Sequence, residues 1–268
     1  MTPANFLETV IAERGADASA LDRGALERAA RAAPAVRSLA GALRACRERG
    51  RLGVIAEVKR VSPALGTLSS IVDPAALART YAGAGATAIS VLTEPRHWGG
   101  SLEDLRAVRA AVEVPLLCKD VIVDERQLLA ARAAGADAVL LIGEALDDER
   151  LTALLLLTAA LGMEALVEAH ETGAFRRVLA TSARIVGINA RDLRHPATLD
   201  RHRVELLSTL VGRDRLLVAE SGIGGVADAE GLPSRVDAML IGTALVTAAD
   251  PVPLLRALAA VPVAAVRR

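Results

Sequence analysis

The sequence is poor in cysteine, in aromatic residues and in long apolar runs, and each shortage excludes a class of protein. Two cysteines in 268 residues, Cys46 and Cys118, provide no disulfide framework, so we expect a cytoplasmic protein. The longest apolar run, 153–161, is far shorter than the roughly 20 residues that cross a bilayer, and the N-terminal region shows no signal-peptide pattern. We therefore expect no membrane partner. The 32 basic and 32 acidic residues balance, and no basic run is interleaved with aromatics, which argues against a nucleic-acid partner.

Lysine is the most informative shortage. Of the 32 basic residues, 30 are arginine and only Lys59 and Lys119 are lysine. Arginine can replace lysine as a surface cation or in an ion pair, but its pKa above about 12 prevents it from giving up a proton near neutral pH. The two remaining lysines are therefore candidates for proton transfer, and two chance survivors on the surface are the alternative.

Short apolar runs alternate with longer amphipathic stretches from residue 53 onward, a pattern typical of strand–helix units. The predicted strands are Gly53–Lys59, Thr87–Leu92, Pro115–Lys119, Asp137–Ile142, Met163–Glu168, Arg184–Asn189, Leu216–Ser221 and Asp237–Ile241. The predicted helices between them include Pro74–Gly83, Leu102–Ala111, Asp124–Ala134, Asp147–Leu161 and Arg201–Val211. Gly85 and Gly135 each follow a predicted helix and precede a strand, which is typical of a left-handed helix end.

Eight such units predict an α/β fold, a closed (β/α)8 TIM barrel with an N-terminal helical extension. An open doubly wound sheet is the alternative, but the Gly-rich nucleotide loop expected after its first strand is missing. We expect one domain over 1–268, with the extension over 1–50 and the barrel over 51–268. In the extension, Phe6–Arg14 and Val36–Arg49 are predicted helices, joined by an Arg/Ala-rich connection.

Polar residues follow one strand after another at the C-terminal ends, where barrel enzymes build their sites. These residues are Glu57, Lys59, Lys119, Asp120, Glu168, Asn189, Glu220 and Ser221. Glu57 and Lys59 lie two apart and should share the inward face of one strand. Ion pairs that merely fill the barrel mouth are the alternative, yet both lysines of the chain fall in this group. Charges crowded there should shift one another's pKa values, as acid–base catalysis requires.

The loops after the last two predicted strands resemble a phosphate cradle. Ser221 and Gly222 follow the seventh strand, and Gly242 and Thr243 follow the eighth at the start of a short helical turn. Small residues allow backbone N–H groups to approach an anion, and barrel phosphate sites cluster after these strands. A small phosphorylated substrate is therefore the expected partner, with turn glycines as the alternative reading.

Other reactive residues show no catalytic pattern. The four histidines have no metal-ligand spacing, so we expect no metal and mostly loop or surface positions for them. Cys118 directly precedes Lys119 on the same predicted strand, so its side chain should point to the opposite face and pack toward the helices. Trp98, the single tryptophan, lies in a loop, where it either covers the barrel mouth or stacks on an aromatic ligand.

Seven segments together resemble the motifs of the indole-3-glycerol-phosphate synthase family, in the family's order. They are Val54–Pro63, Ser90–Glu94, Leu117–Asp120, Leu166–His170, Gly187–Leu193, Glu220–Ile223 and Leu240–Gly242. The resemblance covers the chain from about residue 50 to its end. It implies a lyase of tryptophan biosynthesis that closes the indole ring of 1-(2-carboxyphenylamino)-1-deoxyribulose 5-phosphate, with loss of carbon dioxide and water and without a cofactor.

The resemblance also implies residue roles. Lys119 is similar in position to the general acid, while Glu57 and Glu168 resemble the second acid and the base in an order that stays open. Lys59 would interact with anionic groups of the substrate. Further substrate contacts are implied for Ser62, Trp98, Val121, Leu140, Asn189, Arg191, Leu193 and Glu220. Phosphate contacts are implied for Ser221, Gly222, Gly242 and Thr243.

The chain departs from the family pattern at several positions around these residues. Ala64 and Leu65 stand where the family usually carries Ser-Lys, Val121 and Trp98 where Phe is usual, and Thr243 where Ser is usual. These departures favour one alternative, a paralogue acting on a ring-substituted substrate. Two further alternatives do not depend on them: a Schiff-base aldolase or isomerase on the same fold, and a non-catalytic barrel that binds phosphorylated ligands. We expect a monomer or weak homo-oligomer.

Overall fold

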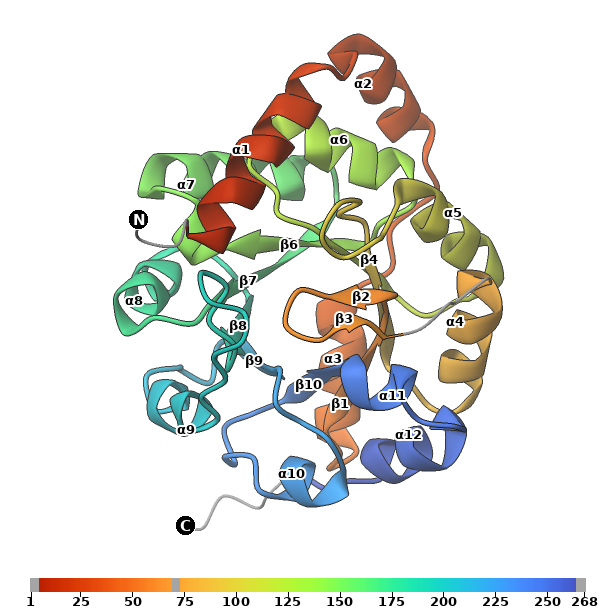
Figure 1. The fold of residues 1–268 in the computed structure, drawn as a ribbon, viewed down its shortest axis with the longest axis vertical. Helices are drawn as coiled ribbons and strands as arrows, with labels where there is room; N and C mark the ends of the chain where they lie inside the picture. Colours follow the sequence, from red (N-terminus) through yellow and green to blue (C-terminus); the bar gives the residue numbers. More distant parts are fainter. Residues whose placement is uncertain (1–4, 69–72, 264–268) are drawn as a thin grey trace.

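The computed structural model describes residues 5–68 and 73–263, and their core is a closed eight-stranded parallel barrel surrounded by helices (Figure 1). The barrel strands, in the order in which they pair around the ring, are β1 (Gly53–Val58), β10 (Ala238–Ile241), β9 (Leu216–Glu220), β8 (Ile185–Asn189), β7 (Glu164–Ala169), β6 (Ala138–Ile142), β5 (Leu116–Lys119) and β4 (Ala88–Leu92). β1 pairs with both β10 and β4, which closes the ring. The predicted (β/α)8 barrel is confirmed.

Four of the nine described helices after the strands begin at aspartates. The nine helices are α4 (Pro74–Gly83), α5 (Leu102–Ala111), α6 (Glu125–Ala133), α7 (Asp148–Ala160), α8 (Thr172–Ala180), α9 (His202–Ser208), α10 (Val226–Glu230), α11 (Thr243–Val246) and α12 (Pro251–Ala259), with a short 3-10 turn, η1 (Gly143–Ala145). The side chains of Asp73, Asp124, Asp147 and Asp250 accept backbone N–H groups at the starts of four of them. As predicted, Gly85 and Gly135 adopt positive φ after α4 and α6.

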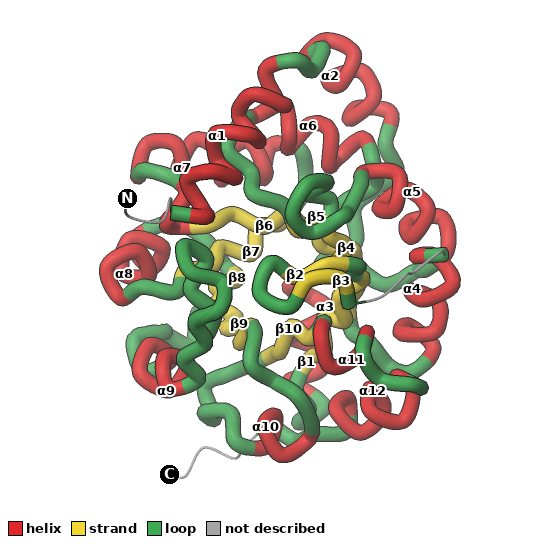
Figure 2. Tube along the Cα trace, in the orientation of Figure 1, coloured by secondary structure: helices red, strands yellow, loops and turns green. Residues whose placement is uncertain are grey.

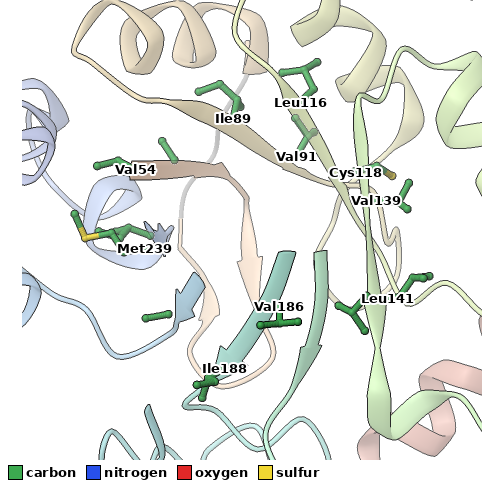
Figure 3. Packing of buried hydrophobic residues seen from close by; sticks show 14 of the residues in the cluster. Val54, Ile89, Val91, Leu116, Cys118, Val139, Leu141, Val186, Ile188 and Met239 are labelled. Atoms are coloured by element: carbon green, nitrogen blue, oxygen red, sulfur yellow. The ribbon is translucent and has the colours of Figure 1, made fainter. Parts of the chain in front are cut away.

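Strand alternation separates two apolar layers. Residues such as Val54, Ile89 and Met239 face outward and pack against the ring of helices (Figure 3; the ring itself is red in Figure 2). Cys118 belongs to this outer layer, as predicted, and burial raises the pKa of its thiol to about 12. Ile55 and its inward-facing counterparts fill the barrel interior.

The N-terminal segment forms three helices where the sequence predicted two: α1 (Phe6–Ser19), α2 (Arg23–Ala32) and α3 (Leu39–Glu48). The Arg/Ala-rich connection was wrongly predicted to lack a helix. Asp22 caps α2 by accepting the N–H of Ala25, and α2 packs beside α6 (Figure 1). Alanine and arginine are strong helix formers, so a cap was sufficient to start a helix there.

Helices α1 and α3 lie at opposite ends of the barrel. Leu39 and Leu43 of α3 join the interior cluster, and Glu164, the first residue of β7, accepts the N–H of Ala40 at the start of α3. Leu7 of α1 joins the same cluster, and the α1 backbone begins with a hydrogen bond from Phe6 N to Arg194 O in the loop after β8. The extension therefore covers the closed end of the barrel with α3 and borders the open end with α1.

The loop after β1 contains a second feature that the sequence analysis missed. Two short antiparallel strands, β2 (Val61–Ser62) and β3 (Gly66–Thr67), fold it into a small hairpin that lies in front of the barrel in Figure 1. Gly66 adopts a positive φ of 73° at the turn. The hairpin carries Ser62 to the mouth of the barrel.

Candidate active site

A cavity of about 440 Å³ opens at the C-terminal ends of the strands. Fifteen of the sixteen predicted site residues line it: Glu57, Lys59, Ser62, Trp98, Lys119, Val121, Leu140, Glu168, Asn189, Arg191, Leu193, Ser221, Gly222, Gly242 and Thr243. Glu220 does not line it. Its side chain is fully buried and accepts a hydrogen bond from Lys119 Nζ. A direct substrate contact, as implied for Glu220 by the resemblance, therefore has no support from the cavity.

The two lysines and two of the glutamates form one connected ion cluster. Lys59 Nζ lies 2.7 Å from Glu57 Oε1, and Lys119 Nζ lies 3.2 Å from Glu57 Oε2. Lys119 Nζ is also 3.1 Å from Glu220 Oε2. The inward alternation of β1, β5 and β9 brings these side chains together, since each lies within one residue of the end of its strand.

The cluster holds its members in definite charge states. Burial raises the pKa of Glu57, but the charges of Lys119 and Lys59 outweigh this and lower that pKa to about 2. Burial lowers the pKa of Lys119, but the three surrounding glutamates outweigh this and raise the pKa above its ordinary value. At neutral pH Glu57 is therefore a carboxylate and Lys119 an ammonium group.

The pKa of Glu168 is shifted in the opposite direction from that of Glu57, toward the protonated form. Burial and the adjacent carboxylate of Glu220 raise the pKa of Glu168 well above its ordinary value, against the opposing charge of Lys119. Glu168 Oε2 and Glu220 Oε1 are both buried and find no hydrogen-bond donor among the described residues. A proton on Glu168 that is shared with Glu220 satisfies both oxygens.

Gly187 of β8 makes room for this pair of carboxyl groups. A Cβ at Gly187 would lie 2.3 Å from Glu220 Oε1 and 3.0 Å from Glu168 Cβ. Any larger residue would push the two side chains apart. The close approach of Glu168 and Glu220 therefore depends on a glycine in the inner face of the barrel.

Asn189 connects the carboxyl pair to the loops of the neighbouring strands. Its Nδ2 donates to Glu168 Oε1 at 3.3 Å, and its Oδ1 accepts from Ser221 Oγ at 2.8 Å and from the N–H of Arg191 at 3.0 Å. Arg191 is half-buried, and its guanidinium donates to the carbonyl of Pro196. The amide thus fixes both the acid beneath it and the loop that carries Arg191.

The glycine-lined end of the cavity lies after β9 and β10. Ser221 and Gly222 have φ values of 66° and 78°, so two successive residues turn in the left-handed region. Gly242 lies much closer to the ion cluster than its predicted role suggests, because a Cβ there would be 2.2 Å from Glu57 Oε1 and 2.9 Å from Lys59 Nζ. A substitution at Gly242 would therefore disturb Glu57 and Lys59 of the ion cluster as well as any anion.

The opposite wall is apolar and includes helix α1. Phe6 and Leu7 line the cavity beside Trp98, Val121 and Leu140. Phe6 packs against Trp98 with ring centroids 5.7 Å apart. Phe6 and Leu7 were not predicted from the sequence, because candidate site residues were sought at the ends of predicted strands and these two lie in a helix before the first strand. The one available signal was that Phe6 is one of only two phenylalanines in the chain.

Buried carboxylates shape the loops around this wall. Glu94 is fully buried and accepts the backbone N–H groups of Arg96, His97 and Trp98, which fixes the loop that presents Trp98 to the cavity. His170 is buried, unlike most of the histidines, and lies between Glu144 and Asp192 with N–O distances of 3.2 and 3.0 Å. It joins the loops after β6, β7 and β8.

A closed barrel with carboxyl and ammonium groups gathered in a cavity at its C-terminal mouth is typical of a (β/α)8-barrel enzyme. The family model for indole-3-glycerol phosphate synthase matches residues 7–258. The chain belongs to the indole-3-glycerol phosphate synthase family.

Curated relatives agree with this assignment. The chain is 46% identical over 252 residues to an indole-3-glycerol phosphate synthase of Parafrankia, covering 92% of each chain. It is 49% identical over 223 residues to indole-3-glycerol phosphate synthase 2 of Streptomyces coelicolor, covering 83% of this chain and 84% of the relative. A solved 3-hexulose-6-phosphate synthase from Salmonella typhimurium shares the fold alone, with a TM-score of 0.63 and 16% identity over 78% of this chain and 98% of that one.

Proposed function

We propose that the chain closes the indole ring of 1-(2-carboxyphenylamino)-1-deoxyribulose 5-phosphate, releasing carbon dioxide and water, as the family's name implies. The observation that carries the proposal is the single cavity that unites an ionised base, a protonated carboxyl group and two ammonium groups. An apolar wall at one side suits an aromatic ring, and the glycine-lined turns opposite suit a phosphate. No helix among the described residues is long and apolar enough to cross a membrane.

The charge states support a division of labour among the proton-transfer groups. When a ring carbon attacks the ketone, the developing alkoxide takes a proton from the Lys119 ammonium group. Loss of carbon dioxide restores the aromatic ring. Glu168, which enters the reaction protonated, then protonates the departing hydroxyl group, and Glu57 removes a proton from the adjacent carbon.

The ion cluster couples the first proton transfer to the last. In the resting site Glu57 is a weak base because two ammonium groups stabilise its charge. Once Lys119 has given up its proton, Glu57 loses one of these partners and its pKa rises. The base thus becomes stronger after the acid has acted.

The same charges argue against a Schiff-base mechanism. Imine formation requires a neutral amine, whereas Lys119 and Lys59 are both in contact with the Glu57 carboxylate and the pKa of Lys119 is raised. Borohydride in the presence of a keto-sugar phosphate should therefore leave both lysines unmodified.

The two cysteines are free in the structure, which supports a reducing cytoplasm as the site of the reaction.

The direct test is turnover of the unsubstituted substrate, followed by the fluorescence of the indole product. Lys119→Arg keeps the ion pairs but removes an ammonium group that can release its proton. We expect kcat to fall about 10²- to 10⁴-fold, the usual contribution of a general acid, with little change in KM. A variant that keeps a third of the turnover would exclude Lys119 as the acid, and a wild-type protein without turnover would contradict the function.

A further inference from the structure

We infer that Arg201 binds the phosphate group of the substrate, a role that rests on the proposed function. Arg201 precedes α9 and lines the cavity at its glycine-lined end, beside Gly222 and Gly224. It does not lie at a strand end, and no motif drew attention to it in the sequence. Four cationic side chains of the described residues line the cavity, and their surroundings distinguish Arg201 from the other three.

The other three cations are engaged elsewhere. Lys59 and Lys119, the only lysines of the chain, are held by Glu57 in the proton-transfer cluster. The Arg191 guanidinium donates to the carbonyl of Pro196 and lies close enough to Glu57 to sense its charge. Among the described residues, Arg201 is thus the cation that borders the turn formed by Ser221–Gly224.

The side chain of Arg201 is built against this turn. A Cβ at Gly222 would lie 3.1 Å from Arg201 Cγ and 3.4 Å from Arg201 Nε, so the arginine packs on the face that the glycine leaves open. Gly222 has a φ of 78°, a conformation that side chains rarely adopt. The positive φ and the missing Cβ together place a guanidinium group next to the backbone of the turn.

Asp228 orients the guanidinium without neutralising all of its donors. Asp228 Oδ1 accepts from Arg201 Nη1 at 2.6 Å, while Asp228 Oδ2 accepts the N–H of Gly224 at 2.7 Å. One carboxylate thus ties the arginine to the far end of the turn. Arg201 Nε and Nη2 have no partner among the described residues, and the side chain is 60% exposed, so donors remain for a phosphate that enters from solvent.

The experiment compares Arg201→Gln with wild type in two assays, one of which needs no turnover. Calorimetric titration with inorganic phosphate should show binding weakened about tenfold or more, since charge-assisted hydrogen bonds to phosphate are lost. KM for the phosphorylated substrate should rise by a similar factor while kcat stays within about twofold of wild type. Arg201→Lys should restore part of the binding. Arg213→Gln, which removes an exposed arginine from the neighbourhood of Arg47 and Arg235, is the matched control and should change neither quantity.

A ligand without phosphate separates binding from structural damage. Inhibition by N-methylanthranilate, which carries the ring, its carboxylate and the amine but no phosphate, should be the same in Arg201→Gln and wild type. Equal phosphate affinity in the two proteins, or equal loss of affinity for phosphate and N-methylanthranilate, would overturn the role of Arg201. Failure of the wild-type protein to convert the substrate would instead contradict the proposed function, and the phosphate titration would still decide the role of Arg201.

Discussion

At the scale of single residues, the site contrasts two buried glutamates of the same type. Glu57 faces two ammonium groups and is ionised, whereas Glu168 faces the carboxylate of Glu220 and keeps its proton. Both lie at strand ends and are nearly inaccessible to solvent. Because burial raises the pKa of both glutamates, the charged partners of each decide the difference between them, and so which is suited to act as an acid and which as a base.

The raised pKa of Glu168 predicts a pH-dependent stability. Because this pKa lies above that of the unfolded chain, the folded protein holds a proton that the unfolded chain has released, and stability falls as pH rises through the folded pKa. Glu168→Gln mimics the protonated group and removes this loss. The melting temperature of the variant should therefore rise relative to that of wild type as the pH increases from 5 to 9. Each kcal/mol of stability that the variant does not lose should raise this difference by about 2–4 °C.

Thermal unfolding at several pH values measures this difference. The matched control is Glu149→Gln, an exposed glutamate of α7, which should follow wild type across the range. A Glu168→Gln variant that loses stability relative to wild type as pH rises would show that Glu168 is ionised in the folded protein. Its turnover should fall in any case, because the amide cannot donate the acidic proton.

At the scale of elements, helix α1 is tied to the strand end that carries Lys119. Arg14 donates through Nε and Nη2 to both oxygens of Asp120 at 2.8 Å, and Asp120 also accepts from Thr93 Oγ1 at 2.8 Å. Burial raises the pKa of Asp120 even though Arg14 opposes the rise. The pair thus links the extension to the residue next to the proposed acid.

Breaking this pair should destabilise the protein strongly. Arg14→Leu leaves the buried Asp120 carboxylate without its cation, and such losses cost about 3–5 kcal/mol. The double variant Arg14→Leu/Asp120→Asn removes the uncompensated charge and should recover part of that cost. Urea unfolding at neutral pH measures both, and equal stability of the single and double variants would contradict a charge effect. We also expect a lower kcat in the single variant, because Lys119 would lose its fixed position.

The loop that carries Trp98 and the segment after β5 that carries Val121 form a shared wall of the cavity. We therefore expect Trp98, which is larger than the usual Phe, to compensate for Val121 by filling the space that a Phe would occupy there. Trp98 packs against Phe6 and does not point away from this wall. Trp98→Ala should therefore raise KM for the unsubstituted substrate about 2- to 10-fold, the loss expected for an aromatic contact, and Val121→Phe should change it less.

Kinetics with unsubstituted and ring-substituted substrates test this directly. If Val121→Phe lowers KM for the unsubstituted substrate while Trp98→Ala leaves it unchanged, the pocket is wider than compensation allows. The wild-type protein would then prefer a ring-substituted substrate. This outcome would favour the specialised paralogue over the ordinary enzyme.

At the scale of the whole molecule, the N-terminal segment packs against both ends of the barrel. Leu39 and Leu43 of α3 pack into the closed end, and Phe6 and Leu7 of α1 line the open end. We therefore propose that 1–268 is one cooperative unit, with no separable extension. The expectation of a monomer or weak homo-oligomer stays a prediction, which sedimentation at several concentrations would test.

Removal of residues 1–50 should abolish cooperative folding. The shortened chain would expose the interior surface that α3 covers and would lose the ion pair of Asp120 with Arg14. We expect one urea transition for the full chain, seen equally by circular dichroism and by Trp98 fluorescence, and none for 51–268. A chain that lacks only 1–4, and so no described residue, is the control. A cooperative transition in 51–268 would show that the barrel folds alone.

The sequence by itself determined the number of strand–helix units, the residues at the strand ends and the faces that they share. These depend on local periodicity and on alternation along single strands. Both patterns can be recognised in a short segment of sequence without knowledge of the rest of the chain. Glu57, Lys119 and Glu168 could therefore be selected before the structure was known, and so could the outward direction of Cys118.

Only the tertiary structure decided which of these residues face one another. The contact of Lys119 with Glu220 spans 101 positions, and that of Arg14 with Asp120 spans 106. Such pairs follow from the closure of the barrel and the placement of α1, on which local sequence has no influence. The ionisation states of Glu57 and Glu168, the withdrawal of Glu220 from the cavity and the approach of Arg201 to Gly222 all depend on these long-range contacts, because a charge in a buried site responds to its nearest partners in space.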